Sequence, residues 1–270
     1  MKKVLSLVMA LVLAFALVGC NKTETPSTAL EAWEQELGTP GVIKVGISPD
    51  YEPYEYYDED GNIVGFDVDM ANELMAYIGG DTPYTIEFVV LDFNNIISAL
   101  NAGSIDIGIS CFTANPERDC AFTEPYLNSM QVVVVANDSG ITSVEQLVGK
   151  TVAAGENTTG AGVAEDLAEE YGEMNIISPG GGGGYPAMFG MLESGAVSAV
   201  VCDNAVGQAF VNSDPDKFTI LEGEYAVENT CVIVKKTNTE LYAIVNDAVI
   251  QFNASDKKAE LVELYELIAY

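Results

Sequence analysis

The chain has 270 residues, with 41 acidic side chains, 11 basic side chains and no histidine, so its formal net charge is −30. Binding to nucleic acid is not expected, because it needs a basic surface that neutralises phosphates. The absence of histidine also removes Ser-His-Asp and Cys-His catalysis and most metal sites, so we expect no cofactor and no metal.

Residues 1–19 have the pattern of an export signal. Two lysines precede an apolar run from Val4 to Val18, broken only by Ser6, that is too short to span a membrane comfortably. The letters LVGC that follow resemble a bacterial lipobox, so we expect Cys20 to be lipidated and to become the mature N-terminus. An ordinary secretory signal or an anchor helix is the alternative. Residues 20–41, with the polar sequence NKTETPST, are expected to tether a domain outside the membrane.

Strand and helix patterns alternate after the tether, which is typical of an α/β protein. The predicted elements of the first half are a strand at 42–48, a hairpin at 54–66 with an Asp60-Gly61 turn, a helix capped by Asp67 and ended by Gly79-Gly80, a strand near 86–90, a helix near 94–101 and a strand at 105–110. Apolar residues recur at helical spacing after Asp67, which supports the first of these helices.

Residues 99–110 and 191–202 share one pattern, in which a helix ends at a glycine and a core strand follows. This similarity predicts two lobes built alike, with ligands beyond the carboxyl ends of the strands. Strand runs at 131–135 and 231–236 bracket the second copy. If both strands run between the lobes, lobe 1 comprises residues 42–131 and 229–270, lobe 2 comprises residues 132–228, and the two crossings form a hinge.

Three stretches resemble ligand-binding loops but lack their essential residues. The sequence GENTTGAG has Ala161 where a phosphate loop needs lysine. The five glycines at 180–184 lack the strand-to-helix context of a dinucleotide site, so we expect a turn before a helix that starts near Pro186. The sequence DEDGN at 58–62 lacks the spacing of a calcium loop and predicts only a hairpin turn.

Four cysteines remain once Cys20 is set aside, namely Cys111, Cys120, Cys202 and Cys231. They allow three disulfide pairings, and buried free thiols are the other interpretation. Zinc is disfavoured because the chain has neither a CxxC motif nor a histidine.

Arg118 is the sole arginine of this acidic chain, and it follows a strand end that carries the hydroxyls of Ser110 and Thr113. The planar guanidinium binds a carboxylate through two parallel hydrogen bonds, which lysine cannot do. We therefore predict that Arg118 clamps a carboxylate. A surface arginine paired with Glu117 or Asp119 is the alternative.

The sequence resembles the bacterial extracellular solute-binding proteins of family 3, the amino-acid receptors of ABC importers. The resemblance extends over residues 42–265 and is carried, in order, by VIKVGISPDYEPYEYYDEDGNIVGFDVDMANEL, LNAGSIDIGISCFTANPER, FTEPY, GKTVAAGENTTG and GAVSAVVCD. It implies a two-lobe, type II periplasmic-binding-protein-like fold, in which two α/β lobes joined by a two-strand hinge close on a free amino acid.

The resemblance also implies which residues bind the ligand. In the family, an arginine, a nearby threonine and a helix start hold the α-carboxylate, two aromatic residues enclose the side chain, and a strand-end aspartate binds the α-ammonium. On this chain the matching positions are Thr113, Arg118, Thr158, Thr159 and Gly160 for the carboxylate, Tyr51 and Phe93 for the side chain and Asp203 for the ammonium, with Ser110 beside them. Free N–H groups at a helix start favour an anion, and a carboxylate pairs with a cation.

Each of these assignments has a simpler alternative. Tyr51 and Phe93 could be ordinary core aromatics, and Asp203 and the two threonines could be plain helix caps. The chain also departs from the family pattern, because the segment from Arg118 to Phe122 is shorter than is usual there. This departure leaves the shape of the nearby pocket wall undetermined.

We therefore expect a monomeric, lipid-anchored binding protein on the outer face of the cell membrane, which captures a free amino acid by hinge closure and delivers it to an ABC permease. The alternative is a cyclohexadienyl or prephenate dehydratase-like enzyme on the same scaffold, which would need a positioned acid or base. The sensory domain of a receptor is a third class, and the absence of an output segment before Tyr270 argues against it.

Overall fold

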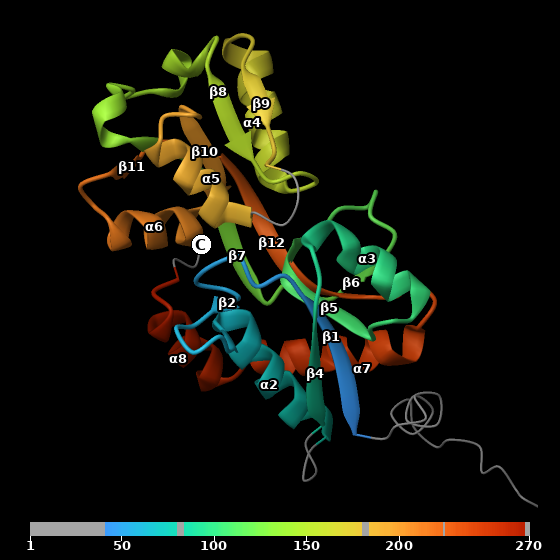
Figure 1. The fold of residues 1–270 in the computed structure, drawn as a ribbon. Helices are drawn as coiled ribbons and strands as arrows, with labels where there is room; N and C mark the ends of the chain where they lie inside the picture. The colour runs from blue at the N-terminus through green and yellow to red at the C-terminus, as the bar shows by residue number, and fades with distance from the viewer. Residues whose placement is uncertain (1–40, 80–83, 180–183, 224, 268–270) are drawn as a thin grey trace, which may run out of the picture.

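The chain folds into two α/β lobes that share one curled sheet (Figure 1). The computed structural model describes residues 41–79, 84–179, 184–223 and 225–267. The expected export signal, the lipidated Cys20 and the tether up to residue 40 lie outside these ranges, as do Gly80 and the first four residues of the five-glycine run.

The secondary-structure elements alternate between strands and helices, as predicted. The strands are β1 (Val42–Ile47), β2 (Tyr56–Tyr57), β3 (Ile63–Val64), β4 (Thr85–Val90), β5 (Ile107–Thr113), β6 (Ala121–Phe122), β7 (Leu127–Ala136), β8 (Thr151–Ala154), β9 (Asn175–Ile177), β10 (Ala199–Asp203), β11 (Phe218–Ile220) and β12 (Tyr225–Val234). The helices are α2 (Phe66–Gly79), α3 (Phe93–Ala102), α4 (Thr159–Tyr171), α5 (Gly184–Glu193), α6 (Asn204–Ser213), α7 (Thr239–Asn253) and α8 (Asp256–Leu264), with short 3-10 helices at Asn137–Ser139 and Val144–Leu147.

The main sheet has the strand order β4-β1-β5-β12-β7-β10-β8-β9, with β11 on β7 and β6 on β12. At each end the strands pair in parallel. In lobe 1, β1 pairs with β4 and with β5, and in lobe 2, β8 pairs with β10 and with β9. In the middle, β12 and β7 are antiparallel to each other and to their outer neighbours. Figure 1 shows β7 and β12 running from one lobe to the other, so the chain crosses between the lobes twice.

Lobe 1 buries both faces of its strands. Ile96 and Leu100 of α3 pack on one face, and the apolar sides of α2, α7 and α8 cover the other. The paired residues Gly46 of β1 and Gly108 of β5 leave no room for a side chain, because an added Cβ would clash with Ile105 or Ile233, respectively, and would also lie 3.2 or 3.0 Å from a methyl of Ile96 in α3. Glycine at both positions therefore lets the helix approach the sheet closely.

Lobe 2 repeats the arrangement with a second set of helices. Val163, Ala164 and Leu167 place α4 on one face of β8 and β10, while α5 and α6 cover the other face. The repeated pattern read from the sequence is confirmed, since Gly103 and Gly195 both adopt positive φ, at 76° and 74°, between a helix and a core strand. The left-handed backbone that ends each helix is the conformation that glycine adopts without strain.

Two local predictions are corrected by the structure. Asp67 does not cap α2, because the helix already begins at Phe66 and the Asp67 side chain points into the protein instead, where it accepts hydrogen bonds from Cys111 and Tyr126. Helix α5 begins at Gly184, earlier than the predicted start near Pro186. The predicted turn at 58–62 is confirmed, with the Asp58 carboxylate accepting from the backbone N–H of Asn62 at 2.7 Å.

Cys111, Cys120, Cys202 and Cys231 are free thiols in the structure. Three of them are buried in the core and Cys111 is half-buried, so the fold of the described residues is held by packing. None of the helices in the described ranges combines the length and the apolar character needed to cross a bilayer.

Candidate functional site

A cavity of about 420 Å³ lies between the two lobes and is lined by residues from both. Its size falls within the range of about 300 to 1,000 Å³ that is usual for small-molecule sites. Lobe 1 contributes the segments that follow β1, β4 and β5, and lobe 2 contributes the starts of α4 and α5 and the end of β10. The predicted site residues that line the cavity are Tyr51, Phe93, Ser110, Thr113, Arg118, Thr158, Thr159 and Asp203.

Arg118 lies in the cavity wall, half-buried, in the loop between β5 and β6. Its guanidinium donates to the Thr113 carbonyl at 3.2 Å and to the Asn157 carbonyl of lobe 2 at 2.8 Å. The same group lies 5.5 Å from the ring centre of Phe93 and 5.4 Å from that of Phe112, which is within cation–π range. Burial lowers the pKa of Arg118 from its usual range. The guanidinium is thus oriented by four neighbours. It has five N–H donors, and the two bonds to these carbonyls leave donors for a ligand.

Asp203 and Glu228 form a buried acidic pair on the floor of the cavity. The Gln131 amide donates to both carboxylates, to Glu228 at 2.9 Å, and the Ser129 hydroxyl lies 3.4 Å from Asp203 and 3.3 Å from Glu228. Burial, followed by the charge of Glu228, raises the pKa of Asp203 well above its usual range. Asp203 holds the N-cap position of α6 without capping it by a side-chain hydrogen bond, so its carboxylate is directed to this pair instead.

Thr113 brings the two charged groups of the cavity together. Its carbonyl accepts from Arg118, and its hydroxyl donates to Glu228 at 3.2 Å. A positive group and a negative group therefore lie on either side of a single residue. This spacing suits a small zwitterion, whose opposite charges are separated by only a few bonds.

The aromatic residues of the cavity come from both lobes. Tyr51 packs against Tyr185 of α5 in a tilted arrangement, with 4.6 Å between ring centres. Phe93 stacks on Phe112 at 4.7 Å. Tyr51 and Phe93 are thus not simple core residues, since each presents part of its surface to the cavity while the other part packs on a second ring.

The start of α4 forms the lobe 2 wall. The Thr158 hydroxyl donates to the Gly155 carbonyl at 2.7 Å and accepts from Ala161 N–H at 3.4 Å, so Thr158 caps the helix and also lines the cavity. Gly160 does not line it and lies beneath the wall, where an added Cβ would be 2.9 Å from Gln131 Oε1. Glycine at this position lets the helix start lie directly on the residue that holds Asp203 and Glu228.

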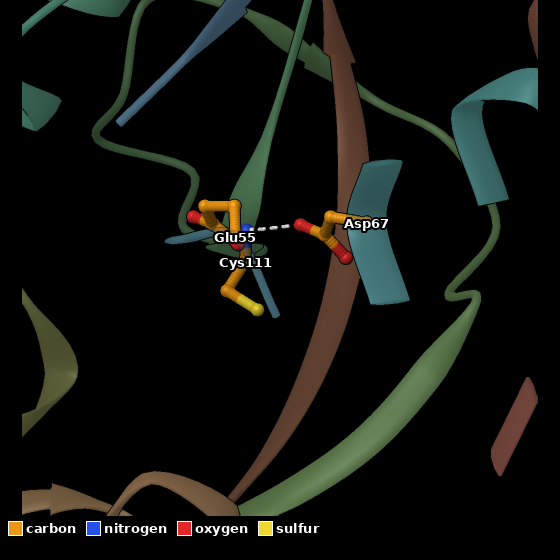
Figure 2. A group of neighbouring side chains, drawn as sticks. All are labelled: Glu55, Asp67 and Cys111. Atoms are coloured by element: carbon orange, nitrogen blue, oxygen red, sulfur yellow. Dashed lines mark hydrogen bonds between the residues drawn. The ribbon is translucent and has the colours of Figure 1, made fainter. Parts of the chain in front are cut away.

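A second buried acidic group, Glu55 and Asp67, lies behind the lobe 1 wall beside Cys111 (Figure 2). One ligand-type atom of each of the three residues lies within 4.8 Å of the others. The Ser110 hydroxyl donates to Glu55 at 2.5 Å, and the Asp67 carboxylate accepts from Cys111 N–H at 3.0 Å. Burial raises the pKa of the Cys111 thiol well above its usual range, so it stays protonated. These bonds already engage the carboxylates, and we assign no metal ion to the group.

The cavity has an excess of acidic over basic side chains. Its lining contains six acidic side chains, Asp50, Glu55, Asp92, Glu156, Asp203 and Glu228, and Arg118 as the basic one among the described residues. Asp50 is half-buried, and burial raises the pKa of its carboxyl. After one carboxylate and one ammonium are paired with Arg118 and Asp203, the remaining acidic groups still favour a further positive charge.

The lobes also contact each other directly at the edge of the cavity. Besides accepting from Arg118, Asn157 of the loop before α4 donates from its side chain to the Asn94 amide oxygen of α3 at 2.9 Å. Asn157 has a φ of 60°, a left-handed conformation that asparagine tolerates better than most residues.

Sequence reasoning did not identify Gln131, Tyr185, Glu228 or Asp50 as parts of the site. Glu228 could have been noticed as an acidic residue just before the apolar run of a predicted strand, and Gln131 as the polar first residue of the other run. Tyr185 follows the five glycines, a segment whose path the sequence leaves open.

Comparison with known proteins agrees with this geometry. The sequence model of the family described as "Bacterial extracellular solute-binding proteins, family 3" matches residues 43–267. The arginine-binding extracellular protein ArtP of Bacillus subtilis is 32% identical over 222 residues, which cover 80% of this chain and 78% of ArtP. A solved ancestral arginine-binding protein bound to arginine is 32% identical, with a TM-score of 0.74 over 83% of this chain and 98% of that protein.

A third similar protein, also of known structure, bears on the enzyme alternative. It is the ancestral amino acid-binding protein AncCDT-1, a precursor of cyclohexadienyl dehydratase, which is 26% identical with a TM-score of 0.74 and covers 86% of this chain and 99% of that one. The three similar proteins are all named as binding proteins. They support a binding protein with this two-lobe fold.

Proposed function

Because the chain belongs to the bacterial extracellular solute-binding proteins of family 3, we propose that it captures a free amino acid in the cavity between its lobes and delivers it to an ABC importer. The observation that carries the proposal is the pair of opposite charges around Thr113, Arg118 and Glu228, with Asp203 joined to Glu228 through Gln131. Arg118 would hold the α-carboxylate, with the N-terminus of α4 opposite it, and Asp203 would hold the α-ammonium.

Capture would proceed by hinge closure. The cavity takes its walls from both lobes, so a ligand that fills it makes contacts that an open form loses, and it stabilises the closed form by that difference. We place the hinge in β7 and β12, near residues 131–132 and 228–229. Small-angle scattering is expected to show a smaller radius of gyration with ligand than without it.

We further propose that the ligand carries a positively charged side chain, with arginine as the first candidate. The excess of acidic groups in the cavity supports a cation, and the faces of Tyr51, Tyr185 and Phe93 suit a guanidinium. The names of the similar proteins given above are consistent with this choice.

The test is a thermal-shift screen of the amino acids, followed by calorimetry with arginine and citrulline. A ligand that binds only the native protein raises its Tm. Citrulline has nearly the shape of arginine but no side-chain charge, and we expect it to bind roughly tenfold or more weakly because a charge-assisted hydrogen bond is lost. Equal affinities for the two would refute the cationic preference, and no shift with any amino acid would refute amino-acid capture.

The same charge argument disfavours the dehydratase alternative. A prephenate-like substrate carries two carboxylates, and the described cavity offers them one guanidinium against six acidic groups. Formation of phenylpyruvate from prephenate by the purified protein would overturn this conclusion.

The location and the delivery step complete the proposal. Lipidation of Cys20 would hold the binding domain on the outer face of the membrane through the tether. Replacing Cys20 with serine is expected to move the protein from the membrane fraction to the medium, while uptake of labelled ligand by the cells should fall. Retention of the Cys20→Ser protein in the membrane fraction would contradict the lipid anchor.

A further inference from the structure

Strand β5 is bulged where it meets the cavity. Phe112 pairs with Cys231 of β12, but the next pair is Gly108 with Ile233, so the three residues from Ile109 to Cys111 oppose Val232 alone. Val232 makes its backbone hydrogen bonds with Thr123 and not with β5: its N–H donates to the Thr123 hydroxyl and its carbonyl accepts from the Thr123 N–H, at 3.1 Å each. Cys111 has a φ of 46°, which is unusual for a residue with a side chain. The sheet ladder therefore does not hold residues 109–111, although it resumes at Phe112 and Thr113.

Two buried carboxyl groups replace the missing ladder contacts. Asp67 of α2 accepts from the backbone N–H of Cys111 at 3.0 Å, the bond that is drawn in Figure 2. Glu55 accepts from the Ser110 hydroxyl at 2.5 Å, and this hydroxyl accepts from the Ser48 N–H at 3.3 Å. Ser110 and Cys111 both line the cavity, so the carboxyl pair fixes a part of its wall.

The pair lacks a positive partner. Glu55 is 1% exposed and Asp67 is fully buried. The titratable groups that face the pair are Asp50 and Tyr54 from the segment after β1, Cys111 of β5, Tyr126 before β7 and, across the cavity, Asp203 and Glu228. None of these groups is a cation. Two ionised carboxylates this close together and out of water would repel each other strongly.

A single proton resolves the repulsion and accounts for an otherwise unexplained atom. Glu55 Oε2 is buried and has no donor among the described groups. One carboxyl oxygen of Glu55 and one of Asp67 lie within 4.8 Å of each other in a buried group, so a proton on one of the two carboxyls removes their repulsion. Asp67 accepts from the Tyr126 hydroxyl at 2.9 Å and from Cys111 N–H, and these donors favour its ionised form. The proton is therefore assigned to Glu55, whose Oε2 accepts no hydrogen bond among the described groups.

We propose that Glu55 is a positioning residue for ligand binding: the single proton that it retains beside Asp67 lets the two carboxyls hold the bulge of β5 in the shape that lines the cavity. Burial, followed by the charge of Asp67, raises the pKa of Glu55 well above its usual range, in agreement with this placement of the proton. Burial also raises the pKa of Asp67 to about 6. As the pH rises through the pKa of Glu55, the proton is lost, the carboxylates repel and the cavity wall is released.

The affinity test rests on the proposed function and compares the wild type with Glu55→Gln, using L-arginine as the probe. Glutamine keeps a donor for Asp67 and an acceptor for Ser110 but does not titrate. Each protein is compared with its own affinity near neutral pH. At alkaline pH we expect the wild type to lose up to roughly tenfold per pH unit beyond the loss in Glu55→Gln. The α-ammonium of arginine also titrates at alkaline pH, but it weakens binding equally in the wild type and in Glu55→Gln. The difference between the two proteins therefore reports Glu55 alone. The exposed Glu87→Gln serves as the matched control and should follow the wild type.

A second measurement detects the proton directly, without a ligand. Infrared difference spectra at neutral pH should contain the carbonyl band of a protonated carboxylic acid, which Glu55→Gln removes in part and Glu87→Gln leaves intact. If arginine does not bind, the band still tests the proton, so failure of the proposed function and failure of this inference are distinguishable. Equal alkaline losses in the wild type and Glu55→Gln, an unchanged band, or a Glu55→Gln protein that does not fold would each overturn the proposal.

Discussion

Replacing Arg118 with alanine removes the basic side chain of the cavity and is the sharpest test of the proposed site. The variant leaves the ligand's carboxylate in a partly buried wall beside six acidic groups, without a counter-charge. Removing one partner of a buried, hydrogen-bonded charge pair costs roughly 2–5 kcal/mol. The affinity should therefore fall by about 30-fold to a few thousand-fold.

The structure favours a loss of affinity in the upper half of this range. Two of the guanidinium's N–H groups are committed to the Thr113 and Asn157 carbonyls, and the stacked rings of Phe93 and Phe112 limit its movement. The remaining donors are thus already oriented, and little side-chain entropy is lost when they bind. Arg118→Lys should recover only part of the loss, because lysine keeps the charge but cannot make two parallel hydrogen bonds.

The assay is calorimetry in a two-by-two design, with the wild type and Arg118→Ala each titrated with arginine and with agmatine. Agmatine is arginine without its carboxylate. Any loss of agmatine affinity in Arg118→Ala therefore comes from the contact of Arg118 with lobe 2 and not from a carboxylate. We expect the substitution to weaken arginine much more than agmatine. If both ligands lose affinity equally, Arg118 acts on lobe closure and does not clamp a carboxylate.

The remaining predictions concern the acidic floor and the glycine beneath it. Asp203→Asn should weaken amino acids far more than ligands without an ammonium group, and equal losses in calorimetry would count against the assignment. Because burial and Glu228 raise the pKa of Asp203, the wild-type affinity should fall as the pH drops through that raised pKa, and a flat acid profile would contradict this. Gly160→Ala should lower the stability by about 1–3 kcal/mol through overpacking against Gln131, whereas Gly162→Ala on the same helix, which has open space, should raise it by about 0.5–1 kcal/mol in denaturant titrations.

The alternating architecture was predictable because it depends on local patterns. The apolar run of β1, the helix spacing before Gly103 and the matching pattern before Gly195 each indicate one element, and the structure confirms them. The position of Arg118 in the cavity agrees with the expectation drawn from its rarity and from the hydroxyls that precede it.

The acidic floor and the carboxyl pair could not be predicted, because they depend on contacts between distant segments. Asp203 and Glu228 lie on different strands, β10 and β12, and Gln131 joins them from a third strand, β7. Asp67 has the sequence context of a helix cap, and only the bulge of β5 shows why its carboxylate is directed inward. Tertiary hydrogen bonds override the local preference at this position.

The direct contacts of Asn157 have a consequence for the kinetics of release. Its bonds to Asn94 and Arg118 join the lobes without involving the ligand, so they add to the barrier for opening. A bound molecule would then leave at a rate set mainly by this opening, and an acceptor at the membrane that separates Asn157 from Asn94 would shorten the residence time without altering the chemistry of the cavity.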